Sequence, residues 1–268
     1  MLRFEKWEGL GNDFILVEAE VAALQVRSLC DRHTGVGADG VLVLGAVDGL
    51  SCRMIVLNAD GSRPEMCGNG LRCVAGYLMD RAGAESGEVV VATDAGPRRC
   101  KVERQPDGSY RVAADMGVAV VGEPLDLAAA ADRAQSGRLP TRPFTAVSVG
   151  NPHAVSFAPF VSEDVDELGP VVDRLVPGGT NVELCQVADG GKRLEVAVWE
   201  RGVGRTRACG TGACAAAAAA AAAGRVPFDE PVDVALAGGV LEIVVARQDG
   251  ALTMTGLARR VFVGETHL

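Results

Sequence analysis

The chain has 268 residues, of which 48% are hydrophobic and 23% charged, and its formal net charge is −9 at pH 7. This is enough chain for one large domain, or for two of about 130 residues that each have their own core. The acidic balance argues against a nucleic-acid partner, which requires a basic face. No apolar run approaches the roughly 20 residues that span a bilayer, and the first residues lack a signal-peptide pattern, so we expect a cytoplasmic protein with no membrane partner.

Alternating apolar and polar residues predict a chain rich in β-strands. Tight hairpin turns are expected at Asp107-Gly108 and at Gly238-Gly239. Because few helices separate the strands, the pattern favours a mixed or antiparallel sheet over a doubly wound parallel one. The predicted strands cover residues 53–58, 88–94, 110–115, 144–149, 153–157, 194–200, 232–236, 240–245, 252–256 and 260–264.

Four helices are predicted between these strands. Residues 71–78 carry apolar side chains at the i, i+3, i+4, i+7 spacing of an amphipathic helix, and Gly83 is placed to end it. The other predicted helices cover residues 126–135, 170–175 and 213–223.

The last of these helices contains nine consecutive alanines, at residues 215–223. Such a run could be low-complexity filler. Alanine is, however, the best helix former, and a helix made of alanine is thin and apolar on every side. We therefore interpret the run as a helix that is buried on all sides, inside a barrel of strands.

The two halves of the sequence resemble each other. Asn58 precedes Cys67 by nine residues, and Glu200 precedes Cys209 by nine residues. In both places a strand ends, a turn with glycine follows, and a cysteine then opens a helix. A Gly-Asn pair also recurs near the start of each half. Three matches in the same order indicate duplicated halves that are related by an approximate two-fold axis.

This duplication predicts the domain organisation. We expect an N-terminal half-domain over residues 1–116 and a C-terminal half-domain over residues 117–257. The final segment, residues 258–268, could belong to either half, and we assign it to the first. The fold class is then α+β, with two pseudo-symmetric domains that each wrap a mixed or antiparallel, barrel-like sheet around a central helix.

Eight cysteines raise the question of disulfides or metal. A chain this long and hydrophobic does not require stapling, and without an export signal free thiols are favoured. No two cysteines have C-x-x-C spacing and the chain has three histidines, so a structural zinc site is not expected. We expect six cysteines, including Cys73 and Cys214, to be small apolar core residues.

The remaining two cysteines, Cys67 and Cys209, each begin a Cys-Gly-x-Gly loop that opens a helix. The start of a helix carries unpaired N–H groups and a partial positive charge, which stabilise a thiolate and bind a carboxylate. One such loop would be read as a turn with a core cysteine. Two loops at matched distances in matched halves instead indicate a site for a small anionic substrate.

Two thiols at one substrate allow three kinds of chemistry. They could form a redox disulfide, or one could be a nucleophile with His153 as its base. They could also be an acid and base pair, in which one thiol removes a proton from carbon and the other delivers a proton to the opposite face. That scheme requires one thiolate and one thiol.

At these residues the sequence closely resembles the diaminopimelate epimerases, which belong to the pyridoxal-phosphate-independent amino-acid racemases. The resemblance spans most of the chain in the expected order, so it is specific where single glycine motifs would not be. The matching motifs are GLGNDF (9–14), DRHTGVGADG (31–40), NADGS (58–62), MCGNGLRC (66–73), GNPHAV (150–155), GTNVEL (179–184) and WERGVGRTRACGTGACAA (199–216).

The resemblance implies two similar domains with the active site in the cleft between them. It implies interconversion of LL- and meso-2,6-diaminopimelate on the route to lysine and cell-wall peptide, with no metal or other cofactor. It also implies a homodimer whose partner is otherwise only the small-molecule substrate.

Site residues follow by matching the family's motifs. Cys67 and Cys209 match the catalytic thiols; Cys209 would deprotonate the LL substrate and Cys67 would supply the new proton. His153 and Glu200 match catalytic residues that support the reacting centre. The matching substrate-binding residues are Asn12, Asn58, Gly68, Asn69, Asn151, Asn181, Glu200, Arg201, Gly210 and Thr211. Arg201 is suited to clamp the distal carboxylate of the substrate.

One position departs from the family pattern, because Gly40 stands where the family often has Gln. We therefore leave Gly40 out of the site. The loss could instead indicate another substrate, such as that of a proline or hydroxyproline racemase, but Arg201 would then have no second carboxylate to bind. The sequence also leaves open a thiol–disulfide redox protein and a non-catalytic protein that binds amino acids.

Overall fold

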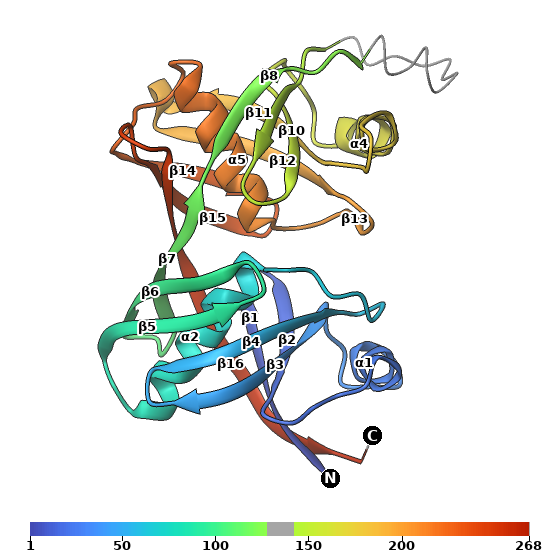
Figure 1. The fold of residues 1–268 in the computed structure, drawn as a ribbon, viewed down its shortest axis with the longest axis vertical. Coiled ribbons are helices and arrows are strands. Elements are labelled where there is room, and N and C mark those ends of the chain that lie inside the picture. Colours follow the sequence, from blue (N-terminus) through green and yellow to red (C-terminus); the bar gives the residue numbers. More distant parts are fainter. Residues whose placement is uncertain (128–141, 268) are drawn as a thin grey trace. The chain divides into compact units, whose positions relative to one another are not determined.

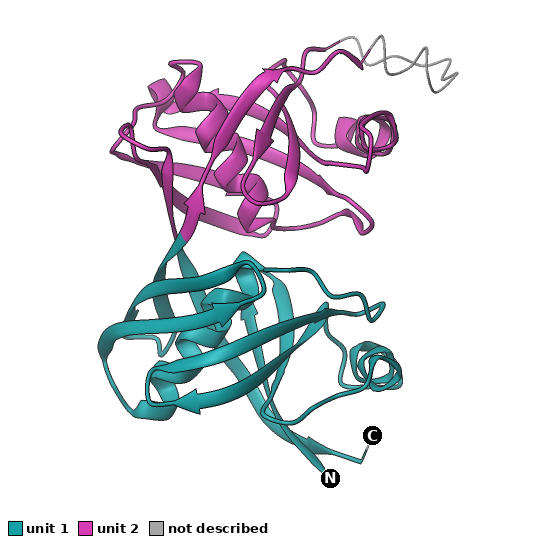
Figure 2. Cartoon of the chain, in the orientation of Figure 1, with its two compact units in different colours: residues 1–115, 255–268 teal, residues 116–254 magenta. Residues whose placement is uncertain are grey.

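The computed structural model describes residues 1–127 and 142–267. These form two compact units, one made of residues 1–115 and 255–268 and the other of residues 116–254 (Figure 2). None of the described helices is long and apolar enough to cross a membrane. The helix expected over 126–135 lies outside the described residues from residue 128 onward.

The first unit is a closed, mixed barrel of strands (Figure 1). The strands are hydrogen-bonded in chain order, and β16 closes the barrel because it pairs with both β1 and β7. The pairs β2–β3 and β4–β5 are parallel, and the pairs between β5, β6 and β7 are antiparallel. The strands are β1 (Leu2–Gly9), β2 (Asn12–Val17), β3 (Gly40–Asp48), β4 (Ser51–Asn58), β5 (Ser86–Thr93), β6 (Gly96–Arg104), β7 (Tyr110–Val118) and β16 (Ala251–Thr266).

Helix α2 (Gly68–Ala82) packs against β1, β2, β4, β5 and β6 of this barrel. Its first twelve residues are all buried, and Gly83 ends it in the left-handed conformation, at φ 62°. A Cβ atom on Gly76 would lie 2.9 Å from the Trp7 ring, so a glycine is needed for this helix to approach β1. A second helix, α1 (Ala23–Cys30), packs against β3 and β4.

The second unit repeats this plan. Its strands are hydrogen-bonded in the order β8, β9, β10, β11, β12, β14, β15 and β16. Helix α5 (Gly210–Ala222) packs against seven of them, from β8 to β15, and α4 (Asp164–Leu175) packs against β11, β12 and β13. The other elements are β8 (Val120–Pro124), β9 (Thr145–Ser148), β10 (Pro152–Ser156), β11 (Asn181–Ala188), η1 (Asp189–Gly191), β12 (Arg193–Glu200), β13 (Gly204–Arg205), β14 (Pro231–Leu236) and β15 (Gly239–Val245).

The predicted fold class, α+β with barrel-like sheets around helices, is confirmed. Every predicted strand overlaps an observed strand, but the two predicted over 252–256 and 260–264 are one continuous strand, β16. The helix predicted over 170–175 begins earlier, at Asp164, because three acidic residues stabilise its first turn. The helix predicted over 213–223 runs from Gly210 to Ala222.

Several elements have no counterpart in the prediction. The buried strand β2 reads as a continuous apolar run, and β6 carries five charged residues, so neither shows clean alternation. Helix α1 has no acidic first turn and only three buried residues to signal it. The unpredicted elements are α1, β1, β2, β3, β6, β8, β11, β13 and η1.

The alanine run is a buried helix, as interpreted from its composition. Ala213 to Ala221 are each at most 3% exposed, whereas Ala222 is exposed at the end of the helix. Because an alanine helix is narrow, strands can approach it closely on every side.

We expect Ala217→Leu to lower the free energy of unfolding by about 1–3 kcal/mol, because the extra carbons have no space in the barrel. Urea denaturation measures this loss. The matched control, Ala222→Leu, adds the same carbons at an exposed position and should leave stability near wild type. Equal stability of both variants would contradict tight packing around α5.

Candidate active site

In the first unit Cys67 caps the start of α2. Its backbone is extended (φ −135°, ψ 116°), and its Sγ accepts a hydrogen bond from Gly70 N at 3.4 Å. The thiol is half-buried, while Gly68 and Asn69 beside it are buried. The sulfur thus occupies the place where a helix start stabilises negative charge.

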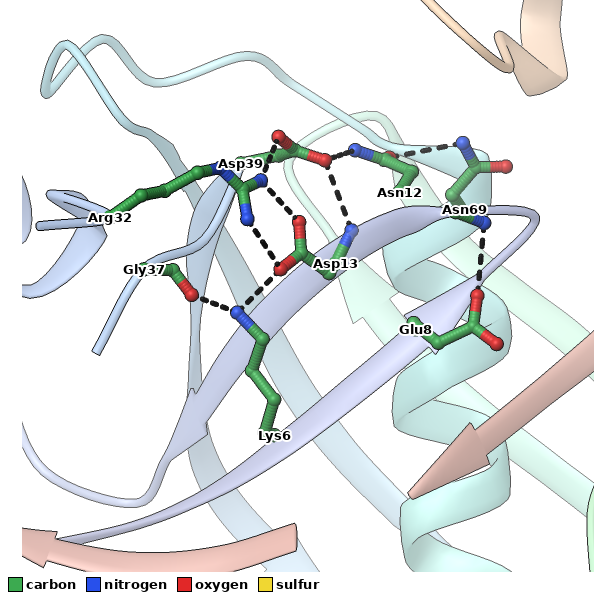
Figure 3. A network of polar contacts seen from close by, with 9 residues as sticks. Lys6, Glu8, Asn12, Asp13, Arg32, Gly37, Asp39 and Asn69 are labelled. Carbon is green, nitrogen blue, oxygen red and sulfur yellow. Dashed lines mark hydrogen bonds and ion pairs between the residues drawn. The ribbon is translucent and has the colours of Figure 1, made fainter. Parts of the chain in front are cut away.

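Asn69, in the first turn of α2, is tied to Asn12 at the start of β2 (Figure 3). Asn69 Nδ2 donates to Asn12 Oδ1 at 3.0 Å, and Asn12 Nδ2 donates to Asp39 Oδ2 at 2.6 Å. The fully buried Arg72 donates from Nη2 to Asn69 Oδ1 at 3.0 Å. Because a carboxylate can only accept and a guanidinium can only donate, Asp39 and Arg72 fix the orientation of both amides.

Two carboxylates, Asp13 and Asp39, and two cations, Lys6 and Arg32, support the hydrogen bonds of Asn12 and Asn69 (Figure 3). Asp13 forms ion pairs with Lys6 Nζ at 2.6 Å and with Arg32 Nη2 at 2.6 Å, and Arg32 also pairs with Asp39 at 2.8 Å. Lys6 is buried and also donates to Gly37 O. Burial favours a raised pKa for Asp13, but the hydrogen bonds from Arg32 and Lys6 prevail and lower it to about 2.

The remaining predicted residue of this unit, Asn58, ends β4 at the same edge of the barrel. Its Nδ2 donates to Ser62 Oγ at 2.9 Å, and the following Ala59 N donates to Asp39 O at 3.1 Å. Gly40 pairs with Asn58 across β3 and β4, and a Cβ atom on Gly40 would lie only 2.7 Å from Leu57 O. The local backbone therefore leaves no space for a longer side chain at residue 40.

In the second unit Cys209 caps α5 in nearly the same geometry, with φ −124° and ψ 113°. Its Sγ accepts a hydrogen bond from Gly212 N at 3.3 Å and lies 3.5 Å from Thr211 Oγ1. Cys209 is buried, unlike Cys67. Burial and the nearby carboxylates of Glu200 and Glu183 raise the pKa of the Cys209 thiol well above its ordinary value, so in this structure the sulfur is held as a thiol.

Glu200 ends β12 and accepts a hydrogen bond from Thr206 Oγ1 at 2.5 Å. Burial of the carboxyl group raises the pKa of Glu200, and the charge of Glu183 adds to this effect, whereas the Thr206 bond and an interaction with Cys209 oppose it. Glu200 and Cys209 therefore share one polar environment at the start of α5.

His153, on β10, lies with its ring fully buried between two acceptors. Its Nδ1 is 2.8 Å from Glu183 Oε1, and its Nε2 is 3.0 Å from Asn151 Oδ1. Asn151 Nδ2 in turn donates to Thr211 Oγ1 at 3.4 Å. The structure thus connects His153, Asn151 and Thr211 to the Cys209 loop.

Asn181 and Arg201 form a second contact group in this unit. Asn181 Nδ2 donates to Pro152 O at 2.9 Å, and Arg201 N donates to Asn181 Oδ1 at 3.0 Å. The Arg201 guanidinium donates from Nη1 to Gly178 O at 2.9 Å. Asn181 therefore joins β10 to the turn after β12, where it places Arg201.

The structure gathers the predicted residues into two groups, one in each unit. The predicted core cysteines are buried, and burial raises the pKa of both Cys52 and Cys100 to about 12. None of the eight cysteines, all within the described residues, forms a disulfide. The polar residues that sequence reasoning missed are Lys6, Asp13, Asp39, Arg72 and Glu183. A charged residue between two apolar residues, as for Glu183 between Val182 and Leu184 in β11, was the available signal.

The sequence profile of the diaminopimelate epimerase family matches residues 4–121 and 145–261. A relative from Synechocystis sp. named diaminopimelate epimerase is 42% identical over 286 aligned residues, which cover 100% of this chain and 99% of the relative. Relatives of the same name from Synechococcus elongatus and Moorella thermoacetica are 40% and 38% identical. They cover 100% and 98% of this chain, and each is itself covered to 99%.

Solved structures share the fold at low sequence identity. A predicted epimerase from Pseudomonas aeruginosa superposes with a TM-score of 0.77 at 18% identity, with 100% of both chains covered. A probable proline racemase from Agrobacterium radiobacter superposes with a TM-score of 0.76 at 15% identity, with 100% of this chain and 93% of the other covered. These two similarities concern the fold alone.

The depressed pKa of Asp13 makes a pH-dependent contribution to stability. The pKa of Asp13 is about 2 in the folded protein, against an ordinary value of 3.8. Ionised Asp13 therefore contributes fully to the free energy of unfolding above about pH 4, and this contribution is lost as the pH falls towards 2. We expect Asp13→Asn to be less stable than wild type at pH 7 by about 2 kcal/mol or more, since Lys6 loses its partner. Urea denaturation should show the difference narrowing between pH 4 and pH 2. A pH-independent difference would contradict the assignment.

Proposed function

This chain belongs to the diaminopimelate epimerase family of enzymes, and we propose that it interconverts LL- and meso-2,6-diaminopimelate with Cys67 and Cys209 as its two acid–base groups. The proposal rests on the cysteine that caps the start of a helix in both units, Cys67 at α2 and Cys209 at α5. Each cysteine begins a buried helix with the same extended backbone, and each sulfur accepts an N–H of the first turn. Each unit thus offers a thiol beside an anion-binding helix start, and the proposed reaction needs both.

Epimerisation requires both the two thiols and the two helix starts. Removing the α-proton of an amino acid leaves negative charge that spreads into the adjacent carboxylate. The backbone N–H groups at Gly68, Asn69, Gly210 and Thr211 would bind that carboxylate and stabilise the transition state. Inversion then needs a base on one face of the α-carbon and an acid on the other, which two half-domains can supply.

The raised pKa of Cys209 favours the protonated thiol as its starting state. A protonated Cys209 is ready to donate to the α-carbon, so Cys67 would be the base in the meso-to-LL direction. In the LL-to-meso direction Cys209 must first lose its proton. Glu200, which lies close to Cys209, and His153 would then hold the substrate amino group and set the ionisation of the thiols.

The distal end of the substrate would meet the polar side chains around the two thiol caps. Arg201 donates from Nη1 to Gly178 O, and we propose that the other N–H groups of its guanidinium bind the second carboxylate of the substrate. Asn12, Asn58, Asn151 and Asn181 complete the polar lining. We propose further that the enzyme acts as a cytoplasmic homodimer without cofactor, and that its product serves lysine and cell-wall peptide synthesis.

Single cysteine variants test the two-thiol assignment. We expect Cys67→Ala and Cys209→Ala each to reduce epimerisation by about 10³-fold or more, because each removes one of two essential proton carriers. Chiral chromatography of LL- and meso-diaminopimelate measures the rate under reducing conditions.

Cys73→Ala and Cys214→Ala are matched controls, since these buried cysteines lie in the same two helices. They should keep most of the activity. Near-wild-type activity in either Cys67→Ala or Cys209→Ala would contradict the mechanism. A reduced wild-type enzyme that fails to epimerise but cycles between dithiol and disulfide would favour a redox function instead.

The two thiols should also differ in reactivity when substrate is absent. Cys67 is half-buried, whereas Cys209 is buried and its pKa is raised, so iodoacetamide should modify Cys67 at least about tenfold faster near neutral pH. Peptide mass spectrometry at successive times measures both rates. Faster modification of Cys209 would contradict the assigned protonation state.

A further inference from the structure

Thr206 contacts a carboxyl group of the proposed active site but has no role in the mechanism above. Its Oγ1 donates a hydrogen bond to Glu200 Oε1 at 2.5 Å. Thr206 lies three residues before Cys209, in the segment that joins β13 to the start of α5. A hydroxyl at this distance restricts the rotation of the carboxyl group that it binds.

The hairpin between β12 and β13 brings the two side chains together. Val203 N donates to Glu200 O at 3.1 Å, which closes the turn after β12. Gly202 and Gly204 take the left-handed conformation in this turn, at φ 76° and φ 106°. Gly204 then pairs with Glu200 across the two strands. Because alternate residues of an extended chain share a face, Thr206 follows Gly204 onto the face of Glu200.

The two neighbours of Thr206 hold this segment in place without the hydroxyl. The exposed Arg205 donates from Nη1 to Asp166 Oδ2 of α4 at 2.7 Å. The carbonyl oxygen of Arg207 accepts a hydrogen bond from Gly238 N, in the turn before β15, at 2.7 Å. Other residues therefore fix the backbone on both sides of Thr206, and its hydroxyl is left to act on the carboxyl group.

The surroundings of the Glu200 carboxyl group make this hydrogen bond important. The carboxyl group is buried, and three ionisable side chains act on it: Glu183 of β11, His153 of β10 and Cys209 at the start of α5. Burial has the largest effect and raises the pKa of Glu200, the hydrogen bond from Thr206 lowers it, and the charge of Glu183 raises it. The hydroxyl thus favours the ionised carboxylate as well as holding one of its oxygens.

We propose that Thr206 is a positioning residue, whose hydroxyl holds the Glu200 carboxyl group where it meets both Cys209 and the amino group of the substrate. Glu200 interacts with the Cys209 side chain in this structure. A carboxyl group that rotated freely would spend less time in the orientation that the reaction needs. The effect on the reaction rests on the proposed epimerase function, whereas the effect on Glu200 does not.

Carbon NMR of protein that contains ¹³C-labelled glutamate tests the contact directly. Glu200→Gln identifies the signal of interest, and Thr206→Val replaces the hydroxyl with a methyl group of similar size. Because the ionised carboxylate loses a donor, we expect Glu200 to titrate at higher pH in Thr206→Val than in wild type. Thr206→Ser keeps the hydroxyl and should titrate as wild type does. An unchanged or lower titration midpoint in Thr206→Val would overturn the proposal, whether or not the enzyme is an epimerase.

Kinetics provides the second readout. In the LL-to-meso direction kcat/KM should fall by about 10- to 100-fold in Thr206→Val and recover in Thr206→Ser, because only the hydroxyl is needed. Thr253→Val makes the same change at an exposed position of β16 and should behave as wild type. An unchanged kcat/KM in Thr206→Val would exclude the positioning role. A wild-type enzyme that does not epimerise, but in which Thr206→Val still shifts the titration of Glu200, would contradict the proposed function and support the contact.

Thr206→Ala keeps the proposal testable if Thr206→Val does not fold. It removes the hydroxyl without placing a methyl group against the carboxyl oxygen, and the contacts of Arg205 and Arg207 remain. We expect Glu200 to titrate at higher pH in this variant as well. A titration midpoint equal to that of wild type in Thr206→Ala would overturn the proposal.

Discussion

In each unit a helix begins inside a barrel of strands, and the polar contacts around it serve to satisfy that helix start. The first turn of any helix has N–H groups without intrahelical partners, and a barrel that covers the helix removes much of the water that could satisfy them. In both units a cysteine sulfur accepts one of these N–H groups. The partial positive charge of the same turn attracts an anion, so the geometry that completes the fold also favours a carboxylate beside each thiol.

The two units build on this constraint in different ways. Around Cys67 an ionic cluster of Lys6, Asp13 and Arg32 supports Asp39, which orients Asn12 and, through it, Asn69. Around Cys209 the support is a buried carboxylate and imidazole pair. The first arrangement surrounds a half-buried sulfur, and the second raises the pKa of a buried one. This difference in burial and pKa between the two sulfurs suits a reaction in which one sulfur gives a proton while the other takes one.

The sequence predicted the features that depend on local pattern. The Cys-Gly-x-Gly repeats and the alanine run imply helix starts and a buried helix, and both are present. The pattern failed where contacts between distant residues decide the structure. The pairing of Glu183 with His153, and of Asp39 with Asn12, joins residues on different elements whose proximity no spacing along the chain reveals. Continuous apolar strands such as β2 were missed because burial on both faces removes the alternation.

If two thiols act on opposite faces of one carbon, the distribution of deuterium between substrate and product will reveal it. LL-diaminopimelate is incubated with the enzyme in deuterated water and the reaction is stopped at early conversion. We expect deuterium at the inverted α-carbon of the meso product, while the recovered LL substrate keeps its α-proton. Deuterium that enters the recovered LL substrate as fast as the product would reveal a single exchanging base and contradict the two-thiol mechanism.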